Sequence, residues 1–146
     1  MRGVILGCRK FKYTDTRKST WPKGIFPTAF GSGEFRDAIV VLSCIEKGDN
    51  MEYIESAVQR VVELNNAFHR KKKVVILPFA HLSNKLEHPR KALPLLVHFQ
   101  ERLQEEGFSV GSASFGTDKD ALFDILGHRA SVSYFEFPYN GKQEVE

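Results

Sequence analysis

Residues 38–45, with the sequence AIVVLSCI, constrain the fold more than any other segment. All but the serine are apolar, so both faces of an extended chain would be hydrophobic here. Charged residues, Asp37 and Glu46, bound the run on either side. Such a pattern is typical of a strand that is covered on both faces. We therefore predict that this segment is a central strand of a sheet.

Two amphipathic helices are predicted to follow this strand. The first is capped by Asp49 or Asn50, and its apolar positions recur every three or four residues. These positions are Ile54, Ala57 or Val58, Val61, Leu64 and Phe68. A short strand at 74–77 ends at Pro78, and a second helix carries Leu93, Leu96, Phe99 or Gln100, and Leu103 before Gly107 stops it. Because of Pro94, this helix either begins at 91–93 or has a distorted first turn.

The remaining segments complete an α+β fold with a mixed β-sheet and two main helices. A first strand is predicted at 4–8, and residues 14–33 form a long loop or arm broken by Pro and Gly. Short strands at 108–113, 121–126 and 131–137 are expected to form an antiparallel meander. With 146 residues and 42% hydrophobic content, the chain fits one domain, residues 1–137, followed by a polar linker or tail at 138–146.

Charge and cysteine content exclude several classes of protein. Basic residues cluster at 9–12, 17–23 and 70–73 although the net charge is only +3, which permits RNA binding. The last cluster has a commoner role as a solvated helix end. The two cysteines are far apart and lack a CxxC pattern, which argues against a disulfide framework and structural zinc. The apolar run near the start is too short for a signal peptide or membrane span, so we expect a cytoplasmic chain without a membrane anchor.

Polar groups that could carry chemistry follow the predicted strands in three turns, at 46–47, 78–84 and 115–120. His81 follows Pro78 at what could be the mouth of a cleft, although a histidine that satisfies a backbone carbonyl is the commoner case. Lys119, between Asp118 and Asp120, either positions a reacting group or is solvated. No GxSxG, HExxH or P-loop motif is present, so the residues themselves give only an α+β domain with a candidate cleft.

Several motifs together resemble one family. PFAHLS at 78–83 is followed by Leu86 and Pro89, then by GFSVGSASFG at 107–116. Lys119 stands three residues after the last glycine of that stretch, and a Gly-His pair occupies 127–128. In these motifs and their spacing, over most of its length, the chain resembles the N-terminal editing domain of archaeal threonyl-tRNA synthetases.

The resemblance implies a D-aminoacyl-tRNA deacylase-like fold, a homodimer and hydrolysis of L-serine wrongly attached to threonine tRNA. Serine lacks one methyl group of threonine, a difference worth only about 1–3 kcal/mol in binding, so a second site must remove it. The terminal 2′-hydroxyl of the tRNA is expected to assist, with no metal and no cofactor. The implied catalytic residues are Lys119 and His81. The implied substrate-binding residues are Pro78, Phe79, Ala80, Phe115, Gly116, Thr117, Ile45 and Glu46.

The chain departs from the family pattern at three places. Asp118 stands where an aromatic residue is common, and Val132 where a glutamate is expected. Cys8, Arg9 and Lys10 replace a more acidic and aromatic pattern. Such divergence suits a freestanding editing protein that works beside a separate catalytic synthetase. Two alternatives stay open: a D-aminoacyl-tRNA deacylase, and an RNA-binding or dimerisation module without activity.

Overall fold

The computed structural model describes residues 1–20 and 28–138. The strands are β1 (Arg2–Lys18), β2 (Ser32–Cys44), β3 (Lys73–Pro78), β4 (Ser109–Ser112), β5 (Thr117–Ile125) and β6 (Val132–Glu136). The helices are α1 (Met51–Leu64), which continues into the π-helical turn η1 (Asn65–His69), the short 3-10 helix η2 (Ala80–Leu82) and α2 (Pro89–Glu105). The predicted tail lies outside the described residues, apart from Pro138.

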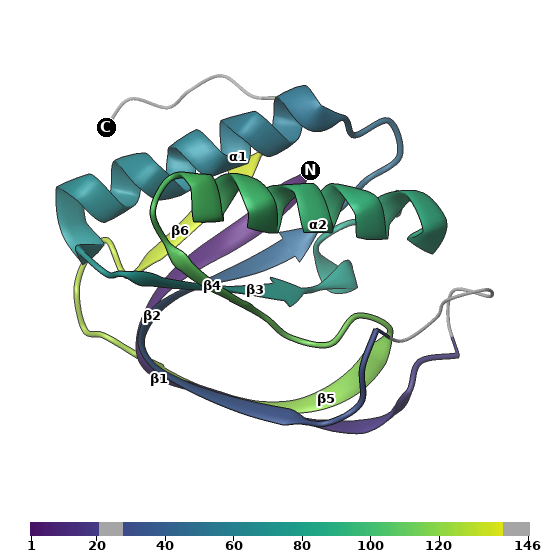
Figure 1. Ribbon diagram of the computed structural model, residues 1–146, viewed down its shortest axis with the longest axis horizontal. Coiled ribbons are helices and arrows are strands. Elements are labelled where there is room, and N and C mark those ends of the chain that lie inside the picture. Colours follow the sequence, from purple (N-terminus) through teal and green to yellow (C-terminus); the bar gives the residue numbers. More distant parts are fainter. Residues whose placement is uncertain (21–27, 139–146) are drawn as a thin grey trace.

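The strands form one mixed sheet in the order β4-β3-β2-β1-β5, and β6 also pairs with β1. The β2–β3 and β3–β4 pairs are parallel, and each is connected through one helix. Figure 1 shows α1 and α2 side by side over the same face of the sheet. The predicted α+β class, the mixed sheet, the two helices and the central position of residues 38–45 are all confirmed.

The helix boundaries follow from local capping. Asn50, rather than Asp49, caps α1, because its side chain accepts a hydrogen bond from Tyr53 N at 3.0 Å. Helix α2 begins at Pro89, earlier than 91–93, after the side chain of His88 accepts a bond from Arg90 N. Pro94 lies inside the helix. The helix ends as expected before Gly107, whose positive φ of 101° suits glycine.

The first strand is much longer than predicted. Residues 9–18 continue β1, so the expected loop at 14–33 is wrong over its first residues and again from Ser32 onward. Phe11, Tyr13 and Asp15 are buried, whereas the intervening Lys12 and Thr14 are exposed. This alternation is the pattern of a strand with one solvated face, and the many charges on that face concealed it. The prediction for residues 21–27 lies outside the described residues.

The predicted antiparallel meander at the end of the chain is also wrong. The three segments do form strands, but β4 pairs in parallel with β3, while β5 and β6 each pair with β1 and not with one another. The amino-acid composition of a short strand indicates how deeply the strand is buried, but it does not indicate which neighbouring strand it pairs with. Consequently β5 is an edge strand whose attachment to the sheet depends on β1.

Two hydrophobic clusters cover opposite faces of the sheet, as the alternation of strand side chains requires. The first cluster lies under the helices and includes Ile5, Ile39 and Phe99. The second includes Leu6, Val40 and Phe11 and lies on the other face. Both cysteines are free and buried in or beside these layers. No helix in the described part of the chain is long and apolar enough to cross a membrane.

The two helices are also joined by an ion pair. Arg102 donates from Nε and Nη2 to both carboxylate oxygens of Glu55, each at 2.9 Å. These hydrogen bonds lower the pKa of Glu55 to about 2. Because the pair is bidentate, it fixes the relative position of α1 and α2 more firmly than a single contact would.

Candidate functional site

A cavity of about 530 Å³ opens at the carboxyl ends of β2 and β3. The turn after β3 and the start of α2 form one side, and residues 115–119 with β5 form the other. The volume is in the range of small-molecule sites. Nine of the ten residues predicted for the site line it: Ile45, Pro78, Phe79, Ala80, His81, Phe115, Gly116, Thr117 and Lys119.

The PFAHLS turn lies at this edge because β2 and β3 are parallel and end together. Pro78 is the last residue of β3 and pairs with Ser43 in the sheet register. Phe79 N then donates to Ser43 O at 2.9 Å, which directs the chain over the end of the sheet into η2. His81 is exposed at the cavity, with its ring 5.3 Å from that of Phe79 in an edge-on arrangement.

Residues 115–117 belong to the opposite wall. Gly116 has a φ of 82°, a conformation that favours glycine, and it lets the chain turn from β4 towards β5. The two ends of the segment between β1 and β2 bond to this wall. Thr28 N donates to Phe115 O at 3.0 Å, and Ser19 N donates to Gly116 O at 2.9 Å. The wall is thereby fixed to β1 and to residues that precede β2.

Lys119 lies within β5, and not at a loop tip between Asp118 and Asp120 as the sequence suggested. Its ammonium group donates to Asp15 Oδ1 at 3.0 Å, to Ser114 O at 2.6 Å and to Thr117 Oγ1. The side chain is 9% exposed. The preceding residue, Asp118, also lines the cavity and forms an ion pair with Arg17 at 2.5 Å.

Asp15 is the site residue that sequence reasoning missed. Its side chain is fully buried, and burial opposes its charge. Hydrogen bonds from Thr117, from Gly31 N and from Lys119 nevertheless hold the pKa of the carboxyl below its ordinary value. The alternation of Phe11, Tyr13 and Asp15 was the signal that could have found it, since it places a carboxylate in an inward row.

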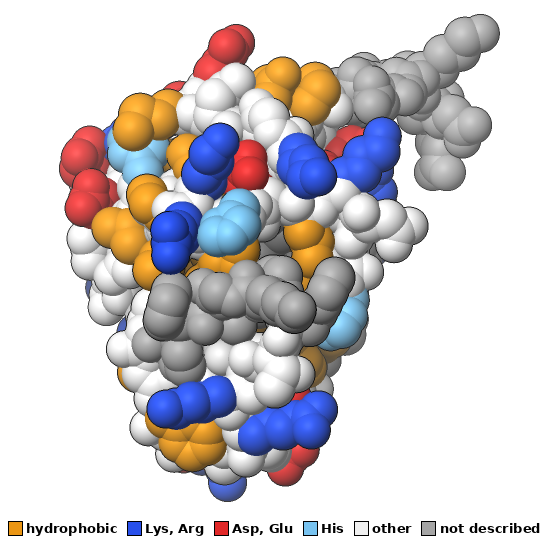
Figure 2. All heavy atoms as spheres, turned by 90° about the vertical axis from the view of Figure 1, so that its right-hand side faces the viewer, with side chains coloured by type: hydrophobic (Ala, Val, Ile, Leu, Met, Phe, Trp, Pro, Cys, Tyr) orange, Lys and Arg blue, Asp and Glu red, His pale blue; other side chains and the backbone are white. Residues whose placement is uncertain are grey.

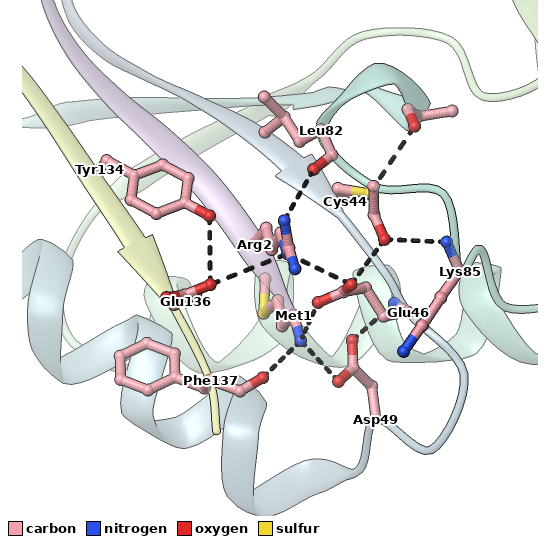
Figure 3. A network of polar contacts seen from close by, with 12 residues as sticks. Met1, Arg2, Cys44, Glu46, Asp49, Leu82, Lys85, Tyr134, Glu136 and Phe137 are labelled. Atoms are coloured by element: carbon pink, nitrogen blue, oxygen red, sulfur yellow. Dashed lines mark hydrogen bonds and ion pairs between the residues drawn. The ribbon is translucent and has the colours of Figure 1, made fainter. Parts of the chain in front are cut away.

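Glu46 is the predicted site residue that does not line the cavity. Its carboxylate accepts from Ser83 Oγ at 2.5 Å and lies 3.2 Å from Arg2 Nε and 3.4 Å from the Met1 ammonium (Figure 3). Burial opposes its charge, but the bond from Ser83 and the two cations lower the pKa of the carboxyl. Arg2 also donates to Leu82 O at 3.4 Å. This network therefore stabilises the PFAHLS turn through residues that do not line the cavity.

The face with the cavity carries many basic side chains. Figure 2 shows Lys and Arg side chains spread over this face, with histidine and some Asp and Glu side chains among them. Arg17, at the cavity, is among the exposed cations. A positive surface of this kind attracts the phosphates of a nucleic acid.

These geometric features agree with a family assignment. A family model for the archaea-specific editing domain of threonyl-tRNA synthetase matches residues 1–135. The chain belongs to this family. The domain is therefore a tRNA-proofreading domain, and its enzyme class is aminoacyl-tRNA deacylase.

Curated relatives support the same assignment. Threonine-tRNA ligase of Staphylothermus marinus is 29% identical over 132 residues, covering 90% of this chain and 21% of that protein. The enzyme of Pyrococcus horikoshii is 31% identical over 116 residues, covering 77% and 18%. That of Thermococcus onnurineus is 34% identical over 99 residues, covering 66% and 16%. The chain spans about a fifth of the length of the curated relatives it matches.

A solved structure shows the same fold at low sequence identity. The c-Myc DNA unwinding element binding protein superimposes with a TM-score of 0.73 at 13% identity, over 95% of this chain and all of that one. The likeness concerns the fold alone. It supports the D-aminoacyl-tRNA deacylase-like fold that the sequence motifs implied.

Proposed function

We propose that this domain hydrolyses the ester of L-seryl-tRNA(Thr) and so removes serine that a threonyl-tRNA synthetase has attached in error. The observation that carries the proposal is the ammonium group of Lys119, held in the wall of a cavity between the PFAHLS turn and residues 115–117. Family membership supplies the reaction class, and the cavity supplies a place for the reacting end of the substrate.

The charge of Lys119 suits ester hydrolysis. Attack of water on the seryl ester places negative charge on the carbonyl oxygen, and a preorganised cation in a site with little water stabilises that charge. Among the residues that line the cavity, Cys44 is the only thiol. Burial, with a further effect of Glu46, raises the pKa of Cys44 to about 11, so this thiol is not a ready nucleophile. The attacking group in this proposal is water, assisted by the 2′-hydroxyl of the terminal adenosine.

The backbone at the cavity edge would bind the substrate. Phe79, Ala80, Gly116 and Thr117 stand on opposite walls, on segments that the adjoining strands hold rigid. Amide and carbonyl groups on such segments can recognise the ammonium and carbonyl groups that every amino acid shares. Selection of serine over threonine then depends on the space in the cavity beside the β-carbon of the substrate, because threonine carries one additional methyl group there.

The direct experiment is hydrolysis of L-seryl- and L-threonyl-tRNA, both on threonine tRNA, by the purified protein in the presence of a chelator. We expect rapid loss of serine, with threonine retained. D-seryl-tRNA on the same tRNA is the matched substrate for chirality. Hydrolysis of the D-ester alone would show a D-aminoacyl-tRNA deacylase, and binding of an uncleavable seryl-adenosine analogue without any hydrolysis would show a binding module.

His81→Ala is expected to have a mild effect on this reaction, at most about tenfold on kcat/KM. The ring is exposed and packs edge-on against Phe79, so its removal alters the shape of the cavity mouth. Steady-state rates with L-seryl-tRNA would measure the effect, with His98→Ala, in α2 and outside the cavity lining, as the control. Complete loss of hydrolysis in His81→Ala would instead give this histidine the chief catalytic role.

A further inference from the structure

The second hydrophobic cluster contains a row of inward side chains in β1 that ends in a charge. Phe11 and Tyr13 are buried there, and Asp15, two residues further on, has a side chain with no exposed surface. A carboxylate in such a position is costly unless it is paired and hydrogen-bonded. Asp15 lies directly opposite Lys119 in the antiparallel register of β1 and β5. The sheet itself therefore brings the two charges together.

The hydrogen bonds of Lys119 account for its whole ammonium group. An ammonium has three donors and no acceptor. Its contacts go to Asp15 Oδ1, Ser114 O and Thr117 Oγ1. Since lysine is the donor to Thr117, the hydroxyl hydrogen of Thr117 is directed to Asp15 Oδ1, 2.7 Å away. Lys119 is thus connected to the same carboxylate twice, once directly and once through the Thr117 hydroxyl.

The carboxylate is itself anchored. Gly31 N donates to Asp15 Oδ2 at 3.0 Å, and Asp15 N donates to Gly31 O at 2.8 Å. Asp15 is absent from the residues that line the cavity, whereas Thr117 and Lys119 both line it. Any influence of Asp15 on a substrate must therefore pass through these two side chains.

We propose that Asp15 is a positioning residue for the deacylation, which fixes the Lys119 ammonium in the cavity wall and orients the Thr117 hydroxyl beside it. The inference rests on the proposed function and adds a residue that the family motifs did not indicate. Lysine has a flexible four-carbon stem, so its charge is effective only where neighbours hold it. Asp15, Ser114 and Thr117 together hold the ammonium group at one place in the cavity wall.

The test is Asp15→Asn, alone and combined with Lys119→Met, assayed with L-seryl-tRNA(Thr). We expect kcat to fall on the order of 100-fold in Asp15→Asn, with KM changed less than about threefold, because a misplaced catalytic group costs rate more than binding. In the Lys119→Met background, Asp15→Asn should cause no further loss. A purely structural role would not produce this non-additivity at equal folded fraction.

Asp124→Asn is the matched control, since it also removes an ion pair between β1 and β5, with Arg9, but at a place away from the cavity. It should leave kcat unchanged. Circular dichroism checks that each variant folds; should Asp15→Asn fail to fold, Asp15→Glu, which keeps the charge but displaces it by one methylene group, carries the same test in both backgrounds.

The outcomes separate the inference from the function on which it rests. Wild-type kcat in Asp15→Asn, or a loss that multiplies with that of Lys119→Met, would overturn the positioning role while leaving the deacylase intact. An inactive wild-type protein would instead refute the proposed function, and the positioning role would fall with it.

Discussion

Lys119→Met is expected to lower deacylation of L-seryl-tRNA(Thr) by a factor on the order of 100 or more. Loss of one preorganised electrostatic group at a developing oxyanion costs about 3 kcal/mol, which corresponds to this factor. The decrease should appear in kcat, because the charge of the ester oxygen develops only on the way to the transition state. Single-turnover hydrolysis with excess protein measures it directly.

Lys119→Met is also expected to lower the stability of the fold, which the sequence alone did not suggest. A solvated lysine could be replaced without effect on the fold, but Lys119 is the ion-pair partner of the fully buried Asp15. Removing one member of a buried pair costs about 3–5 kcal/mol. The pKa of Asp15 is lowered in the folded protein, so its contribution is present above its ordinary pKa and is lost as pH falls through the lowered value. Lys119→Met should therefore destabilise the protein most at neutral pH.

The double variant Lys119→Met/Asp15→Asn separates the two effects. It removes both charges, so we expect it to recover most of the stability that Lys119→Met loses, but none of the activity. Urea denaturation at pH 7 measures the first property, and single-turnover hydrolysis the second. Undiminished hydrolysis in Lys119→Met would remove the lysine from the mechanism, whatever its effect on stability.

Eight of the ten predicted site residues belong to two contiguous motifs, PFAHLS and FGTDK, and all eight line the cavity. PFAHLS follows a strand that could be recognised by its apolar run, and FGTDK follows the glycine-rich stretch, so each motif carries its own geometry. The partner of Lys119 could not be found in this way. Asp15 lies 104 residues from Lys119 along the chain, and only the pairing of β1 with β5 brings them together.

The same physical reason explains the errors in the fold. Residues 38–45 are apolar on both faces, and this local property suffices to make β2 central. In contrast, nothing in residues 109–112 or 132–136 specifies a neighbouring strand, and pairing depends on the whole sheet. Glu46 follows the central strand as expected, yet its carboxylate turns to Ser83 and Arg2, outside the cavity wall.

Phe11→Ala is expected to lower the free energy of unfolding by about 3–5 kcal/mol. Unlike Phe99→Ala, it is also expected to lower the deacylation rate of the protein that remains folded. Phe11 is fully buried and pairs across the sheet with Phe35 of β2 and Phe123 of β5, with ring centroids 6.2 Å and 5.0 Å away. The edge strand β5 carries Lys119, and Phe123 packs directly against Phe11. A void at Phe11 therefore loosens the strand that positions the ammonium group.

Phe99→Ala is the matched control, because Phe99 is also fully buried but lies in the cluster under the helices. Both variants should lose similar stability in urea denaturation. The rates are compared at a temperature where both variants are more than nine-tenths folded, which requires an unfolding free energy of at least about 1.4 kcal/mol. Under this condition only Phe11→Ala should show a reduced kcat with L-seryl-tRNA(Thr). Equal rates in the two variants would mean that the position of β5 does not depend on the aromatic contact across β1, and that Asp15 and its hydrogen bonds hold Lys119 in place without it.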